Sequence, residues 1–149
     1  MEISLIEKFD KSRYILLKWS TIGFISWYGT FTVMGTEAKE LMNNNKLIIG
    51  LMLIINFIGW VFWTISLIKT IRLSKKINAD SKLKEALNNE LYRYYDTKSF
   101  VAGYWALAVT ICAFSVITRF YDISASVVCQ LCIFIGVASL LIARLIYYK

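Results

Sequence analysis

The sequence has no histidine and no proline, and its 149 residues include only 10 acidic side chains and three cysteines. Without histidine there is no imidazole base, no histidine-ligated metal and no Ser-His or Cys-His dyad. No glycine-rich phosphate loop precedes a predicted helix, which argues against nucleotide hydrolysis. We therefore expect a protein that is not an enzyme and that needs neither a cofactor nor a metal ion.

Apolar and basic side chains, in contrast, are abundant. Hydrophobic residues make up 58% of the chain and aromatic residues 15%, and the mean hydropathy is +0.56. Both values exceed those of ordinary soluble domains. The 17 lysines and arginines give a net charge of +7. In so apolar a chain, anionic inner-leaflet lipids explain this charge better than nucleic acid does. We interpret residues 1–149 as one integral membrane domain.

Four segments are suited to cross a bilayer, which takes about 20 mostly apolar residues. They are residues 14–34, 47–68, 99–118 and 123–143. The first contains one charged residue, Lys18, and the other three contain none. The predicted fold is therefore all-α, a membrane four-helix bundle of two in-out-in hairpins. A helical cytoplasmic elbow, residues 69–98, joins the second span to the third.

The distribution of basic side chains predicts how these spans are oriented. Of the 17 basic residues, only Lys39, Lys46 and Arg119 fall away from the side of the two termini and the elbow. Lysine and arginine accumulate on the cytoplasmic side of membrane proteins. We therefore expect both termini and the elbow to be cytoplasmic, and the loops 35–46 and 119–122 to face outward.

The elbow is the candidate interaction surface. Asp80 or Ser81 is predicted to start a new helix that continues into the third span, with Leu83, Leu87 and Leu91 on one apolar face. The charged and aromatic side chains of the elbow are predicted to dock a cytoplasmic protein or an anionic lipid. An alternative is a solvated helical hairpin that only connects two spans. The candidate docking residues are Lys75, Lys76, Tyr92, Arg93, Tyr94 and Tyr95.

Within the predicted spans, the notable polar side chains are Asn56, Thr110 and Gln130. No charged residue lies at the centre of a span, which argues against an ion-coupled transporter. An amide in hydrocarbon needs a hydrogen-bond partner, so the first interpretation is bonding between helices. The alternative is that these residues line an oligomeric pore, as in a channel or a membrane effector.

Cys129 and Cys132 form a Cys-x-x-Cys pair in the predicted fourth span. The pair resembles that of quinone-linked, disulfide-forming membrane enzymes, including the vitamin K epoxide reductase type. That resemblance implies a thiol oxidoreductase with these two cysteines as redox residues. Such enzymes also need a second cysteine pair on a loop, and both predicted outer loops lack cysteine. The alternative is that the cysteines fill space as small apolar residues.

Residues 83–91, with the sequence LKEALNNEL, precede Lys98-Ser99 at the start of the third span. This element resembles the juxtamembrane segment of small bacterial four-span membrane proteins of uncharacterised activity. The resemblance implies a bacterial inner membrane and no particular reaction. We thus expect a non-enzymatic membrane protein that acts through assembly, as a homo-oligomer or as an accessory subunit of a membrane complex.

Overall fold

The computed structural model describes residues 2–35, 46–87 and 90–148, and within these ranges it is helical without a strand. The four long helices are α1 (Glu2–Gly35), α3 (Lys46–Ala79), α5 (Glu90–Ile117) and α6 (Ala125–Tyr147). A short helix, α4 (Ser81–Leu87), lies between α3 and α5 in the sequence. The all-α prediction is confirmed for these residues. The expected loop 35–46 lies outside them at positions 36–45.

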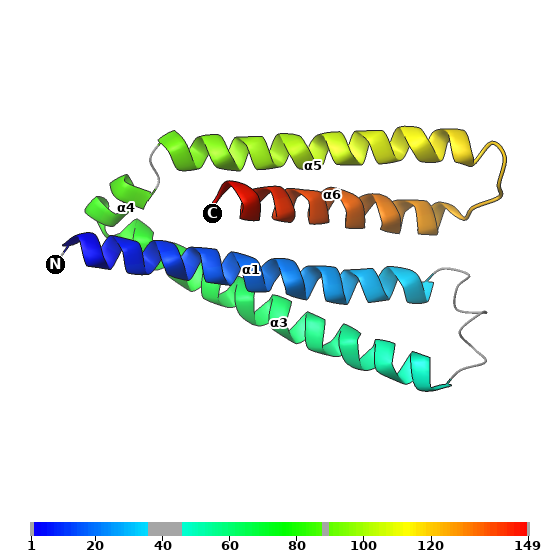
Figure 1. Ribbon diagram of the computed structural model, residues 1–149, viewed down its shortest axis with the longest axis horizontal. Helices are drawn as coiled ribbons and strands as arrows, with labels where there is room; N and C mark the ends of the chain where they lie inside the picture. The colour runs from blue at the N-terminus through cyan, green and yellow to red at the C-terminus, as the bar shows by residue number, and fades with distance from the viewer. Residues whose placement is uncertain (1, 36–45, 88–89, 149) are drawn as a thin grey trace.

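The long helices follow one another in space in the order α3, α1, α6, α5 (Figure 1). The pair α1 and α3 and the pair α5 and α6 run antiparallel, and α1 packs against α6 to join the two pairs. Helices α3 and α5 therefore lie at the two edges of the arrangement. Both ends of the chain lie toward the end that carries α4, and the connection from α5 to α6 lies at the opposite end.

Three of the described helices, α3, α5 and α6, are long and apolar enough to cross a membrane. Large apolar side chains remain exposed along them, such as Phe57 at 64%, Val109 at 64% and Ile133 at 50%. Such extensive apolar surface is typical of a protein whose solvent is lipid. The three helices indicate an integral membrane protein.

Helix α1 is not among the helices that are apolar enough to cross a membrane, because polar residues interrupt its apolar sequence. The structure hides several of these residues: Ser20, Thr21 and Thr32 are buried, while Trp19 and Phe31 are exposed. The hydroxyls of Thr21 and Thr32 bond to backbone oxygens one turn earlier, at 2.9 and 2.8 Å. The polar side of α1 therefore faces its neighbours, and larger apolar side chains lie on its surface.

Glycines allow the two helices of each pair to pack closely against one another. A Cβ added to Gly23 would lie 2.7 Å from the backbone nitrogen of Trp63, and one added to Gly59 would lie 2.6 Å from that of Trp27. In the other pair, a Cβ on Gly103 would lie 2.8 Å from the Cβ of Leu140. Such close backbone approach is common where small residues meet between membrane helices.

A helix begins at the position that the sequence predicts, next to Asp80 and Ser81. Helix α3 extends to Ala79, and Asp80 then begins α4, with its Oδ1 accepting from the backbone N–H of Leu83 at 3.4 Å. Leu83 and Leu87 are buried against Ile77 of α3. The predicted continuation of this helix into the third span is described as α4, which extends to Leu87, and α5, which extends from Glu90. Positions 88 and 89 lie outside the described residues.

Candidate functional site

Charged and aromatic side chains from three helices meet at the end of the molecule that holds both termini. We call these residues the terminal cluster. It brings together side chains that lie more than 70 positions apart, because α1, α5 and α6 all have an end here. Its members are Asp10 and Arg13 of α1, Tyr92 and Asp96 of α5, and Arg144 and Tyr148 at the end of α6.

Arg13 connects α1 to the other elements of the cluster. Its Nη1 donates a hydrogen bond to the backbone oxygen of Leu87 at 2.7 Å. This carbonyl is the last of α4, one of the group that a helix leaves without an internal partner. The guanidinium carbon also lies 5.1 Å from the ring centre of Tyr92 and 5.9 Å from that of Tyr148. Both distances suit a cation–π contact.

Tyr92 links α5 to α1 through a carboxylate. Its hydroxyl donates a hydrogen bond to Oδ1 of Asp10 at 2.8 Å. Burial, followed by this hydrogen bond and the negative charge of Asp10, raises the pKa of Tyr92 from 10.0 to about 12. The phenol therefore stays protonated throughout the physiological range, and the bond to Asp10 persists across it.

Asp96 links α5 to the end of α6. Its Oδ1 lies 2.8 Å from Nη2 of Arg144 and accepts a hydrogen bond from the hydroxyl of Tyr148 at 3.0 Å. The side chains of Asp96 and Arg144 are each 35% exposed, so solvent weakens their attraction. Burial raises the pKa of Tyr148. The ion pair thus joins residues that are distant in sequence.

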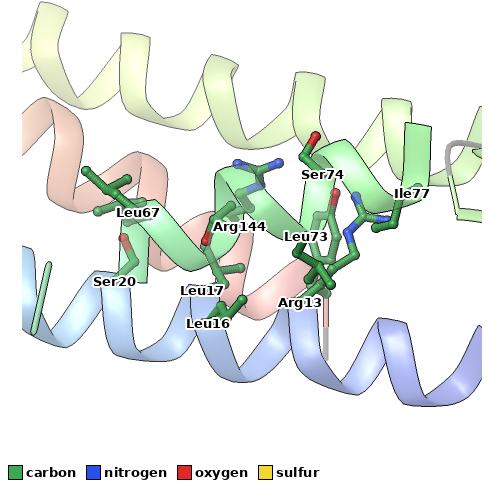
Figure 2. A pocket seen from close by; sticks show the side chains of 12 residues that line it. Arg13, Leu16, Leu17, Ser20, Leu67, Leu73, Ser74, Ile77 and Arg144 are labelled. Atoms are coloured by element: carbon green, nitrogen blue, oxygen red, sulfur yellow. The ribbon is translucent and has the colours of Figure 1, made fainter. Parts of the chain in front are cut away.

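A pocket of about 250 Å³ lies next to the cluster, between α1, α3 and α6 (Figure 2). Arg13, Arg144 and Tyr148 line it, whereas the carboxylates of Asp10 and Asp96 do not. Figure 2 shows Ser20 and Leu67 toward one end of the view and Arg13 toward the other, with Arg144 between them. The remaining lining residues are Leu16, Leu17, Thr70, Leu73, Ser74, Ile77 and Leu141. The pocket thus combines cationic and apolar walls.

The structure divides the predicted docking residues into two groups. Tyr92 and Tyr95 are partly buried, Tyr92 within the terminal cluster and Tyr95 stacked on Tyr147 with ring centres 6.1 Å apart. Arg93 and Tyr94 are exposed, and Nζ of Lys98 lies 4.6 Å from the ring centre of Tyr94. The exposed lysines 75 and 76 lie on the last turns of α3. Only part of the predicted set thus remains open to a partner.

The polar residues of the predicted spans have different environments. Nδ2 of Asn56 donates to the backbone oxygen of Trp27 at 2.9 Å and lies 3.0 Å from the hydroxyl oxygen of Thr30. Bonding between helices is therefore confirmed for Asn56. Thr110 is buried and donates to a backbone oxygen of its own helix. Gln130 lies near the end of α1, and its Oε1 is buried without a partner among the described residues.

The two cysteines of the Cys-x-x-Cys pair lie on α6, and the third, Cys112, lies on α5. Cys129 and Cys112 are exposed, and Cys132 is buried; all three are free thiols. Cys132 lines a groove between α5 and α6 together with Gly103 and Gly136. No group of histidine, cysteine or acidic residues suited to a metal ion occurs among the described residues.

Sequence reasoning did not select Asp10, Arg13, Asp96 or Tyr148 as site residues. The available signal was their position, because each lies just outside a predicted span, at the end where the sequence places both termini. Charges at one membrane boundary can meet whenever their helices pack together. The sequence did not indicate that α1 would be the helix of its pair that packs against α6.

The chain matches no family model, and neither the curated proteins nor the solved structures include one that is similar to it. The geometry of the described residues therefore carries the functional argument alone.

Proposed function

We propose that this chain is a four-span membrane protein that acts through assembly rather than catalysis. Its two termini and the α4–α5 connection lie in the cytoplasm of a bacterial cell. There the exposed basic and aromatic residues Lys75, Lys76, Arg93 and Tyr94 engage an anionic lipid surface or a cytoplasmic partner. The protein works as a homo-oligomer or as a small subunit of a membrane complex.

The observation that carries this proposal is that polar side chains within the spans bond to neighbouring helices, whereas charged side chains gather at one end of the spans. Within the apolar helices, polar side chains hold helices together, as Asn56 does with α1 and as Ser66 does by donating to the backbone oxygen of Leu16 at 2.6 Å. Charged and aromatic side chains gather at the end with α4. Recognition chemistry is thus concentrated at one membrane boundary, and the spans are arranged for packing.

The buried polar face of α1 supports a fourth span. A helix covered on two sides by other helices need not be apolar all round. Helix α1 packs against both α3 and α6, and its residues Ser20, Thr21 and Thr32 are buried. The even number of crossings keeps both termini on one side, the side that the basic residues indicate.

Accessibility of single cysteines tests this topology. In a cysteine-free background, Lys11→Cys and Lys84→Cys are expected to react with a membrane-impermeant maleimide only after the cells are opened, whereas Arg119→Cys reacts in intact cells. If α1 does not cross, position 11 becomes reactive from outside while position 84 stays protected. That result would contradict the four-span arrangement.

The mass of the purified complex tests the assembly. In mild detergent, we expect several copies of the chain, or one copy with another protein, whereas a monomer without a partner would contradict the proposal. The double variant Arg93→Ala and Tyr94→Ala is then expected to weaken binding to a partner or to anionic vesicles. Its matched control, Phe120→Ala with Tyr121→Ala, changes exposed side chains at the opposite end and should bind normally.

A further inference from the structure

Basic side chains and apolar side chains both line the pocket between α1, α3 and α6, and one class of ligand can contact both. We propose that it binds the phosphate headgroup and the first acyl segment of one anionic phospholipid. The inference rests on the proposed placement of the four helices across the membrane. It differs from docking at Lys75, Lys76, Arg93 and Tyr94, none of which lines the pocket.

Two arginines provide the headgroup site. A guanidinium carries five N–H donors, and arginine binds phosphate in a bidentate manner. Arg13 uses Nη1 for the backbone oxygen of Leu87, and Arg144 uses Nη2 for Asp96, so each retains further donors. The two guanidinium carbons lie 5.9 and 5.5 Å from the same ring centre, that of Tyr148.

The local charge favours an anion. Arg13 and Arg144 line the pocket, whereas Asp10 and Asp96 do not. Tyr148 adds a phenol that is held by Asp96. A cationic headgroup is repelled by the two arginines, and a zwitterionic headgroup adds a positive charge beside its phosphate that weakens the net attraction.

The apolar wall favours a lipid over a water-soluble phosphate compound. Leucines and one isoleucine form most of the lining beyond the arginines. The volume of about 250 Å³ is just below the roughly 300 Å³ at which drug-sized pockets begin. It suits a headgroup and the start of one chain, with the rest of the lipid lying along the exposed apolar surface. A water-soluble phosphate compound would not cover the apolar side chains of that wall.

The depth of the pocket agrees with this occupant. Arg13 directly precedes the first predicted span and Arg144 directly follows the fourth, so both lie at the cytoplasmic boundary. Ser20 lies within the first predicted span, Leu67 lies near the end of the second, and Thr70, Leu73, Ser74 and Ile77 lie beyond it in the elbow. The opening therefore meets the headgroups of the inner leaflet, where anionic lipids are concentrated.

Native mass spectrometry of the full-length protein in detergent micelles tests the proposal, with phosphatidylglycerol as the probe. The wild type should bind one phosphatidylglycerol with high occupancy, and Arg13→Gln should weaken that binding about tenfold or more, equivalent to losing a charge-assisted hydrogen bond. Ser20→Leu, which fills the pocket from α1, should do the same. The control Arg72→Gln removes an exposed arginine that does not line the pocket and should leave the Kd unchanged. Circular dichroism checks that each variant is folded.

Several outcomes would overturn the proposal. Equal binding of phosphatidylcholine would exclude recognition of charge, and equal binding of glycerol phosphate would identify a soluble phosphate as the ligand. If Lys75→Gln with Lys76→Gln abolishes lipid binding and Ser20→Leu does not, the lipid binds the exposed surface instead. That result leaves the proposed function standing, whereas failure of the cysteine-accessibility test removes the four-span topology independently.

Discussion

The contact between Gly59 of α3 and α1 provides the sharpest test of the packing. An alanine Cβ at position 59 would lie 2.6 Å from the backbone nitrogen of Trp27 and 3.0 Å from the Cβ of Ser26. Neither atom belongs to a flexible side-chain end, so the two helices must separate. A gap of 0.5–1 Å removes about a quarter to a half of each dispersion contact at the crossing. The same movement stretches the bond from Asn56 to the oxygen of Trp27, now 2.9 Å long.

We therefore expect Gly59→Ala to cost about 1–3 kcal/mol through overpacking. Replacing glycine by alanine inside a helix also gives back up to about 1 kcal/mol through helix propensity. Gly50→Ala serves as the matched control, because a Cβ there meets nothing within 4 Å. The propensity effect is common to both variants, so the difference between them isolates the close crossing.

Unfolding by dodecyl sulfate in mixed micelles measures this difference. Tryptophan fluorescence is the suitable signal, since Trp27 and Trp63 stack at the crossing with ring centres 4.8 Å apart. Gly59→Ala should be less stable than Gly50→Ala by about 1–3 kcal/mol. A difference below about 0.5 kcal/mol, the usual range for exposed sites, would refute the close approach of α1 and α3.

Three further measurements address the polar contacts. Asn56→Leu removes the amide bonded to α1 and should lower the free energy of unfolding by about 0.6–1.7 kcal/mol in the same titration; an unchanged midpoint would show that the bond is not needed. Asp96→Asn should cost no more than about 1 kcal/mol because its ion pair is partly exposed, and a double-mutant cycle with Arg144→Gln should show coupling of the two residues. The pKa of Tyr92, raised from 10.0 to about 12, means that the folded state holds the phenolic proton more tightly than the unfolded chain. The stabilisation that the protonated Tyr92 contributes is thus fully present below pH 10, and it is lost as the pH rises toward 12. In an ultraviolet absorbance titration, Tyr92→Phe should remove the tyrosine that ionises last and Asp10→Asn should lower its pKa; an unaltered curve would contradict the Asp10 contact.

Local patterns in the sequence predicted the features that depend on neighbouring residues. Uncharged runs identified α3, α5 and α6, and the capping chemistry of Asp80 identified the start of α4. The need of an amide for a partner in hydrocarbon predicted the interhelical bond of Asn56. Each of these inferences requires only the local sequence and the nature of the solvent.

The remaining features depend on which helices become neighbours. Asp96 pairs with Arg144 because α5 packs against α6, a neighbour that the local sequence does not specify. The apolar periodicity predicted that Leu91 shares the face of Leu83 and Leu87. The structure instead leaves Leu91 52% exposed, whereas Leu83 and Leu87 are buried against Ile77.

The polar composition of α1 and the terminal cluster have the same cause, which is the packing of α1 against more than one helix. It packs against both α3 and α6, and its backbone oxygens at Leu16 and Trp27 accept bonds from α3. Its Asp10 and Arg13 contact α4, α5 and α6 at the other helix ends. A helix that serves two sets of neighbours presents less surface to lipid, so it tolerates small polar residues that an edge helix would expose. This position allows α1 to be more polar than the edge helices α3 and α5, whereas α6, which also has two helix neighbours, is apolar.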